Sequence, residues 1–143
     1  RAPGSILRDA ARANPRLPVA EDLLMKPIEL EFLGPAGALV VGQRFPIGAE
    51  ATTISGRVPR QPGAGPTIIV NDDRVTSGRS GHCRIWIEEE AAWIGDCGSD
   101  NGTFLLREDG REPAGSVVSP TALSCGDVVQ IVEYRFVVRE SGS

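Results

Sequence analysis

The arginines of this chain are concentrated in one segment, residues 57–84, where they outnumber the acidic residues. The seven charged residues that carry this excess are Arg57, Arg60, Arg74, Arg79 and Arg84 against Asp72 and Asp73. A forked guanidinium binds a phosphate dianion through charge-assisted hydrogen bonds, each worth about 1.5–3 kcal/mol net. The whole chain has a net charge of −4, so this segregation fits a small anionic group and not a nucleic acid.

Neutral hydrogen-bonding side chains occupy two polar stretches close to this segment. Residues 76–82 read Thr-Ser-Gly-Arg-Ser-Gly-His, and residues 99–103 read Ser-Asp-Asn-Gly-Thr. A hydroxyl can donate to a phosphate oxygen, and an asparagine amide both donates and accepts, as a peptide main chain requires. Both stretches are therefore candidate parts of the same site.

Metal binding has weak support in the sequence. The acidic stretch 96–102 resembles the start of a calcium loop, but its twelfth position is Arg107, where a bidentate Glu is needed. Its third position is Gly98, which has no side-chain ligand. We expect no metal and no cofactor.

Cysteine chemistry is also weakly supported. Cys83, Cys97 and Cys125 form no Cys-x-x-Cys pair, so neither a zinc ribbon nor a disulfide framework is predicted. A hydrolase would need Cys97 or Cys125 to converge with His82, and nothing in the spacing promotes this. We expect a protein that is not an enzyme, with reduced thiols in the cytoplasm.

The elements that position these residues are expected to be short strands. The chain has 17 Gly and 11 Pro among 143 residues, which favours many turns over long helices. Strand-like runs are expected at residues 28–33, 38–41, 44–47, 52–55, 67–70, 83–88, 92–95, 103–106, 128–132 and 135–138. Alternation in several runs, such as Ile28, Leu30 and Phe32, predicts strands with one buried face, and the spacing favours a β-sandwich or barrel.

The first 26 residues differ in composition from the rest. They contain Pro3, Pro15 and Pro18 and little apolar periodicity, which predicts a linker or arm, with one short helix over residues 6–13 as the alternative. We expect a single domain over residues 27–140. Its longest apolar stretch, residues 36–42, is far shorter than the roughly 20 residues of a membrane span, so no membrane partner is expected.

Four motifs follow one another in an order and spacing typical of a known family. They are Gly56-Arg57 after a strand, residues 80–85 (Ser-Gly-His-Cys-Arg-Ile), residues 99–103 after Asp96, and residues 123–127 (Leu-Ser-Cys-Gly-Asp) before the last hairpin. Over about residues 28–139 the chain resembles the forkhead-associated (FHA) domain. The resemblance implies an all-β sandwich of about eleven mostly antiparallel short strands that binds phosphothreonine peptides through loops at one end.

The resemblance also implies roles for individual residues. Arg57 matches the arginine that contacts the phosphate, and Asn101 matches the asparagine that binds the ligand main chain. His82 matches a histidine that supports the binding loop. Gly56, Gly102 and Thr103 are expected to shape the turns next to these residues.

The loop before His82 departs from the family pattern. Counting forward from Asp72 places Thr76 at the family's phosphate-binding serine, whereas counting back three from His82 reaches Arg79, so the loop carries about three extra residues. The hydroxyl ligand could therefore be Thr76, Ser77 or Ser80. We favour Ser77 with Arg79 as a second phosphate-binding guanidinium.

The resemblance predicts a non-catalytic signalling module of a larger protein. Its expected partner is a phosphothreonine-containing protein, such as a kinase substrate. The extra loop residues motivate an alternative, a degenerate scaffold that binds its partner independently of phosphorylation. Frequent Ala, Gly and Arg hint at a bacterial source.

Overall fold

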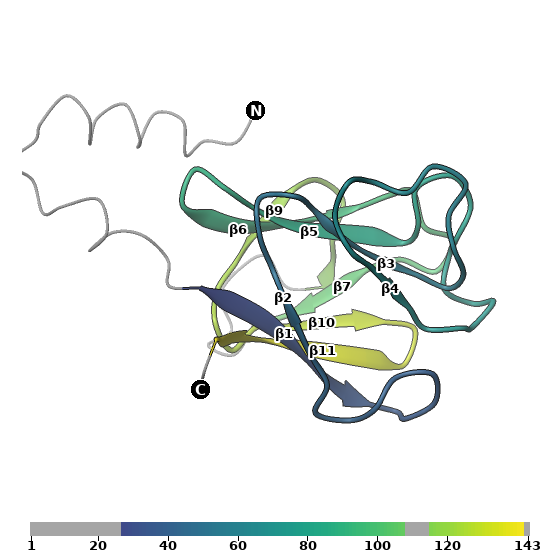
Figure 1. Ribbon diagram of the computed structural model, residues 1–143, viewed down its shortest axis with the longest axis horizontal. Coiled ribbons are helices and arrows are strands. Elements are labelled where there is room, and N and C mark those ends of the chain that lie inside the picture. Colours follow the sequence, from purple (N-terminus) through teal and green to yellow (C-terminus); the bar gives the residue numbers. More distant parts are fainter. Residues whose placement is uncertain (1–26, 108–114, 142–143) are drawn as a thin grey trace, which may run out of the picture.

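Two β-sheets pack face to face in the computed structural model, which describes residues 27–107 and 115–141 (Figure 1). The strands are β1 (Ile28–Gly34), β2 (Arg44–Pro46), β3 (Thr52–Ser55), β4 (Thr67–Ile69), β5 (Cys83–Glu88), β6 (Ala91–Asp96), β7 (Phe104–Leu106), β8 (Gly115–Ser116), β9 (Thr121–Leu123), β10 (Val128–Ile131) and β11 (Tyr134–Glu140). The prediction of an all-β sandwich with about eleven strands is confirmed. The short helix considered for residues 6–13 lies outside the described residues.

The strand order explains why loops far apart in sequence meet. One sheet has the order β2-β1-β11-β10-β7-β8 and the other β4-β3-β5-β6-β9. Strands β3 and β4 are parallel, whereas β5 is antiparallel to β3 and β6 is antiparallel to β5. The ends of β3, β4 and β6 and the start of β5 therefore lie at one end of this sheet. Residues 56–58, 70–82 and 97–103 consequently share that end.

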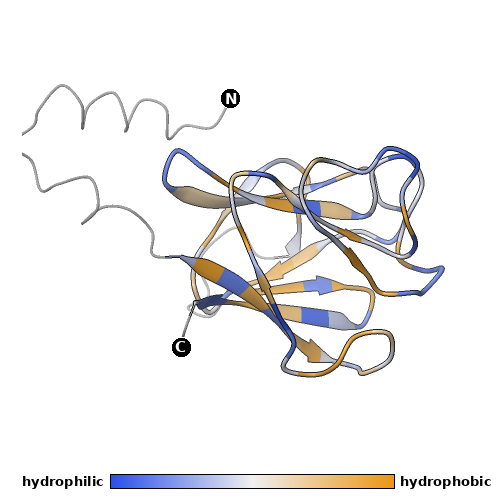
Figure 2. Ribbon diagram, in the orientation of Figure 1, coloured by the Kyte–Doolittle hydropathy of each residue, from blue (hydrophilic) through white to orange (hydrophobic). Residues whose placement is uncertain are grey.

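The core is built from the alternating apolar residues of both sheets. Ile28, Leu30 and Phe32 of β1 are at most 2% exposed, and Phe136 of β11 packs against Phe32 with ring centroids 5.1 Å apart. Full burial of each such side chain stabilises the fold by about 1.5–3 kcal/mol. Figure 2 shows the same alternation as orange and blue segments along β1 and β11.

Two features differ from the expected strand pattern. Residues 38–41 form no strand, because Val40 and Val41 are 67% and 55% exposed and lie in a turn closed by a hydrogen bond from Gln43 N to Val40 O. Strands β8 and β9 are additional; they contain two and three residues, too few to show a period in the sequence.

Candidate functional site

Arg57 lies directly after β3, at the end of the sandwich where the three loops meet. Its backbone N donates to Ser77 Oγ at 2.7 Å. Its guanidinium is exposed, with Nε 3.0 Å from Asp73 Oδ1 and Nη1 3.0 Å from Asn71 Oδ1. The side chains of Arg57 and Asp73 are 60% and 83% exposed, so their ion pair contributes at most about 1 kcal/mol. A bound dianion can therefore displace this aspartate.

Gly56 allows two backbone segments to approach closely beneath Arg57. A Cβ atom at this position would lie 2.2 Å from Val75 O and 2.4 Å from Asp72 O. The backbone of Gly56 accepts a hydrogen bond from Asn71 N at 2.8 Å. Because a Cβ would collide with two carbonyls, the glycine is needed to place Arg57 against the loop that follows β4.

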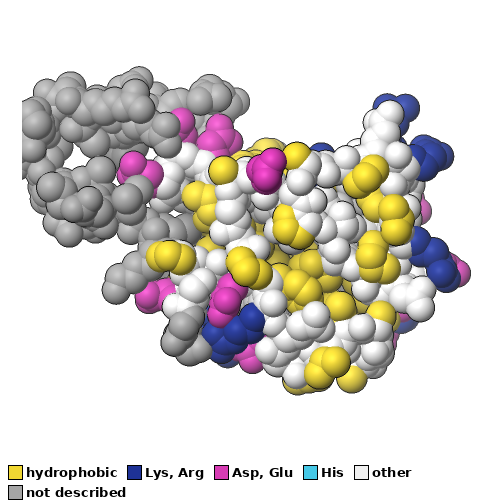
Figure 3. Space-filling view, viewed as in Figure 1, with side chains coloured by type: hydrophobic (Ala, Val, Ile, Leu, Met, Phe, Trp, Pro, Cys, Tyr) yellow, Lys and Arg dark blue, Asp and Glu magenta, His cyan; other side chains and the backbone are white. Residues whose placement is uncertain are grey.

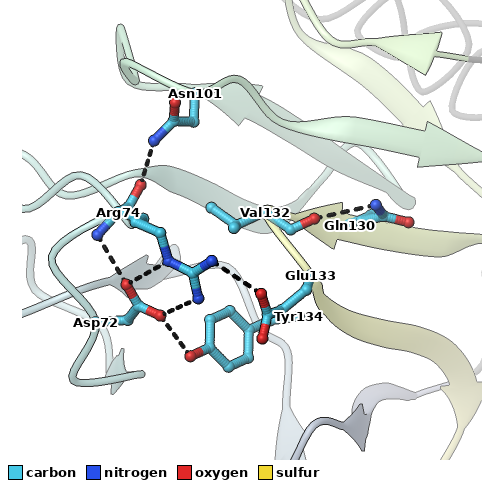
Figure 4. Close-up of polar contacts among 7 residues, drawn as sticks. All are labelled: Asp72, Arg74, Asn101, Gln130, Val132, Glu133 and Tyr134. Atoms are coloured by element: carbon cyan, nitrogen blue, oxygen red, sulfur yellow. Dashed lines mark hydrogen bonds and ion pairs between the residues drawn. The ribbon is translucent and has the colours of Figure 1, made fainter.

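A network of four side chains holds this loop to the β10–β11 hairpin (Figure 4). Arg74 binds Asp72 through Nε at 3.1 Å and Nη2 at 2.7 Å, and it binds Glu133 through Nη1 at 2.9 Å. Tyr134 donates its hydroxyl to Asp72 Oδ2 at 2.6 Å. The hydrogen bond from Arg74, and then the one from Tyr134, hold the pKa of the Asp72 carboxyl far below its ordinary value. This carboxylate stays ionised and fixes the loop.

His82 is fully buried and joins two of the three loops. Its Nδ1 accepts a hydrogen bond from Thr76 N at 2.9 Å, and its Nε2 lies 2.8 Å from Gly102 O. Since a carbonyl only accepts, the ring proton belongs on Nε2. Burial lowers the pKa of His82, which favours this neutral form. His82 thus joins the loops, and its role in supporting a bound ligand stays a prediction.

Asn101 lies on the loop between β6 and β7, across from Arg74. Its Nδ2 donates to Arg74 O at 2.7 Å, and the neighbouring Asp100 N donates to Thr76 Oγ1 at 2.9 Å. Gly102 has φ of +84°, in the left-handed region that favours glycine. The exposed amide of Asn101 is thus fixed beside the loop that Arg57 contacts.

Asp96 stabilises the Asn101 loop from within. Its carboxylate accepts hydrogen bonds from Gly98 N, from Ser99 N and hydroxyl, and from the Thr103 hydroxyl. Burial alone would raise the pKa of Asp96, but the hydrogen bonds from Ser99 and Thr103 lower it overall. Within the described residues, no group of three or more His, Cys, Asp or Glu side chains is arranged to hold a metal ion.

The remaining loop residues show which hydroxyls are engaged. Ser77 Oγ accepts from Arg57 N, and Thr76 Oγ1 accepts from Asp100 N. Ser80 is half-buried, and Arg79 is exposed on the same loop. The structure thus brings Arg57, Ser77 and Thr76 together, with Asn101 bound to the same loop. Which hydroxyl contacts a ligand stays a prediction.

Positive side chains are spread along the loops at this end. Arg60 and Arg79 are exposed, whereas Arg84 is half-buried and places Nη2 3.5 Å from Gln61 O. Figure 3 shows dark blue side chains at this end of the molecule, to the right. The surface that includes Arg57 is therefore suited to an anion.

The three cysteines have raised thiol pKa values, whereas an activated nucleophile has a lowered one. Burial raises the pKa of Cys83, Cys97 and Cys125. Both ring nitrogens of His82 are engaged in hydrogen bonds to backbone atoms. A thiolate nucleophile requires a lowered pKa and an available base, so this geometry gives a cysteine hydrolase no support.

Sequence reasoning missed the network of Asp72, Arg74, Glu133 and Tyr134. Tyr134 is 62 residues from Asp72, and no local motif links them. The role of Asp96 could have been predicted from the sequence, because an aspartate followed three residues later by a serine is typical of a turn whose backbone N–H groups are bound by the aspartate side chain.

Comparisons with solved structures find many chains of the same fold. An Arabidopsis thaliana FHA domain is 22% identical, with a TM-score of 0.60 and coverage of 83% of this chain and 89% of that chain. The Chlamydia trachomatis CT664 FHA domain is 19% identical, with a TM-score of 0.60 and coverage of 82% and 100%. Mycobacterium tuberculosis EmbR, in complex with a low-affinity phosphopeptide, is 19% identical, with a TM-score of 0.61 and coverage of 87% and 28%.

The comparison with protein families gives the assignment. A search of curated proteins gave no match. In the part of the chain that the structure describes, no helix is long and apolar enough to cross a membrane. The sequence pattern of the FHA domain matches residues 54–132, more than half of the 143 residues and the segment that carries Arg57, His82 and Asn101. The chain therefore belongs to the FHA domain family.

Proposed function

We propose that this domain binds phosphothreonine-containing segments of partner proteins and has no catalytic role of its own. The observation that carries the proposal is the position of Arg57. Its exposed guanidinium stands where three loops meet, its backbone is fixed by Ser77, and its present partners are exposed polar side chains that a phosphate can replace.

Each proposed contact uses a group that the loops already hold. Arg57 supplies a forked donor for the phosphate, and the Ser77 hydroxyl beside it supplies a neutral donor once its hydrogen turns outward. Asn101 has its Nδ2 committed to Arg74 O, which directs the amide and leaves its carbonyl oxygen for a main-chain N–H of the partner. The loops are joined through His82, so little ordering is required on binding.

Several similar structures support the nature of the ligand. One belongs to a study of phosphothreonine-dependent FHA domain interactions, and another is the MEK1 FHA domain in complex with the HOP1 pThr318 peptide. These chains are 19% and 18% identical to this one, with TM-scores of 0.56 and 0.55. We infer the same ligand class for this chain because the Gly56-Arg57, His82 and Asn101-Gly102 positions are present in the segment matched by the family.

A degenerate phosphothreonine peptide library, followed by calorimetric titration of the best peptide, tests the proposal. The phosphorylated peptide should bind, and its unphosphorylated counterpart should bind at least about 100-fold more weakly. Arg57→Ala should cost at least about 2 kcal/mol, about 30-fold in Kd, because it removes a charge-assisted pair of donors.

The matched control is Arg139→Ala, which removes an exposed arginine from β11 outside the three loops. It should leave the affinity unchanged within about twofold. Equal affinity for the phosphorylated and unphosphorylated peptides would favour the scaffold that binds independently of phosphorylation and would overturn the proposal.

We also propose the wider organisation of the chain. Residues 27–140 act as the binding domain, and residues 1–26 act as a linker or arm. The three cysteines are unpaired in the structure, which supports a reducing compartment such as the cytoplasm. A bacterial source stays a prediction from composition.

A further inference from the structure

Two arginines beside the proposed phosphate site have no polar side-chain partner within the described residues. Arg60 and Arg79 are both exposed, and they lie on two different loops. By contrast, Arg57 and Arg74 are bound to Asp73 and Asp72 respectively. Among the exposed arginines of these loops, Arg60 and Arg79 are therefore the two that are available without breaking an ion pair, whereas the half-buried Arg84 lies against Gln61 O.

The backbone holds these two residues close together. Arg60 N donates to Gly78 O at 2.8 Å, and Gln61 N donates to Arg79 O at 2.8 Å. Through one hydrogen bond and standard covalent geometry, the Cα atoms of Arg60 and Arg79 must lie within about 8 Å of each other. Two arginine side chains with that separation can converge on one anionic group.

The same hydrogen bonds make the pair a fixed extension of the Arg57 site. Ser77 Oγ binds Arg57 N, and Ser77 O accepts from Gly81 N at 2.7 Å, which closes the loop that carries Arg79. A Cβ on Gly81 would lie 2.5 Å from Thr53 Cγ2, so the base of this loop is packed against β3. The additional residues of the loop thus bring Arg79 to the neighbouring loop and to Arg60.

The local charge is unbalanced. Residues 57–65 and 77–81 contain Arg57, Arg60 and Arg79 and no aspartate or glutamate, and Asp73 from the adjoining residues is paired with Arg57. The chain as a whole has a net charge of −4, so this surface is an exception to its acidic background. Two nearby guanidinium groups repel each other when no anion is present, and a bound anion removes that cost.

We propose that Arg60 and Arg79 form a second anion site that selects partner segments with acidic side chains or a second phosphate next to the phosphothreonine. This proposal rests on the proposed function, since it defines the sequence that the Arg57 site accepts. Carboxylates and phosphates both offer paired oxygens to a guanidinium, and this shared chemistry is the property selected. An acidic flank also raises the association rate through the local positive field.

Titration with matched peptides tests the proposal on the intact chain. One phosphothreonine peptide has neutral flanks, a second set carries Asp at single positions before or after the phosphothreonine, and a third set carries phosphoserine at the same positions. In the wild-type protein, the best acidic flank should tighten binding about fivefold to tenfold over the neutral peptide. The phosphoserine set shows whether a second phosphate is preferred to a carboxylate.

The variant Arg60→Gln should lose most of this gain and keep its affinity for the neutral peptide within about twofold, because Arg60 is not among the residues assigned to the phosphothreonine phosphate. Arg139→Gln, which also removes one positive charge but lies on β11, should retain the gain. Absence of any flank preference in the wild-type protein, or an equal loss for the neutral and acidic peptides, would overturn the second site. Absence of phosphate dependence with the neutral peptide would instead contradict the proposed function itself.

Discussion

Asp73 is expected to weaken phosphopeptide binding, because it occupies the guanidinium that the phosphate needs. Its Oδ1 lies 3.0 Å from Arg57 Nε, and its side chain is 83% exposed. A phosphate bound to Arg57 would stand about 5 Å from this carboxylate if the aspartate did not move away. Replacement by asparagine removes the charge and keeps the shape.

The magnitude follows from Coulomb's law. Two unit charges about 5 Å apart in water interact by about 0.8 kcal/mol, and a phosphate carries about 1.5–2 charges. Screening at physiological salt, with a Debye length of about 8 Å, reduces the total to about 0.8 kcal/mol. The exposed ion pair of the free protein adds about 0.2–1 kcal/mol, since the phosphate no longer has to break it. Asp73→Asn should therefore tighten binding by about 1–1.8 kcal/mol, or about fivefold to twentyfold.

Titration of one phosphothreonine peptide into wild-type protein and Asp73→Asn, at low and physiological salt, measures this effect. The gain should shrink as salt rises. Glu50→Gln is the matched control, because it removes one negative charge beyond the opposite end of β3, about 13 Å or more from Arg57. Unchanged or weaker binding of Asp73→Asn, with an unaltered thermal midpoint, would refute the competition.

The remaining predictions concern the frame of the site. Gly56→Ala should lower the free energy of unfolding by about 1–3 kcal/mol in urea titrations, because its Cβ would lie 2.2 Å from Val75 O; wild-type stability would contradict this. His82 has a lowered pKa, so the unfolded chain takes up the proton first, and stability should fall as pH drops below about 6.5. Thermal midpoints of wild-type protein and His82→Gln between pH 5 and 8 check this, and an equal pH dependence in both would disprove the assignment. Tyr134→Phe should cost about 1 kcal/mol of stability, because it removes the hydroxyl that donates to Asp72 Oδ2. Urea titration should show a matching shift in the wild-type background and none in an Asp72→Ala background, where the acceptor is absent.

The sequence predicted the sandwich because strand formation here depends on local pattern. Alternation in Ile28–Phe32 and Cys83–Trp86 appears in the structure as buried and less buried positions. Residues 38–41 misled the prediction for the same reason. Their apolar run has the composition of a strand, but the Gly34-Pro35 turn and the hydrogen bond from Gln43 N to Val40 O shape them into a loop.

The sequence predicted that the candidate site residues lie together, whereas their roles in binding stay predictions. Arg57, His82 and Asn101 lie at one end of the sandwich, as the motif order indicated. The hydroxyl ligand was not predictable, because the choice depends on hydrogen bonds between loops and not on spacing. Thr76 and Ser77 are adjacent, yet one accepts from Asp100 N and the other from Arg57 N.

The network of Asp72, Arg74, Glu133 and Tyr134 shows how the protein's own side chains hold the loop between β4 and β5. Three acceptors, the carboxylates of Asp72 and Glu133 and the carbonyl of Arg74, take up donors that would otherwise be available at the loop surface. Arg74 therefore stabilises the loop through Asp72 and Glu133, although it lies in the same basic segment as Arg57. The number of arginines in the segment overstates the number available to an anion. Arg57, the arginine that we propose binds the phosphate, differs from Arg74 in its carboxylate partners among the described residues: Arg57 binds only Asp73, which is 83% exposed, whereas Arg74 binds Asp72, which is 14% exposed, and also Glu133, which is 53% exposed.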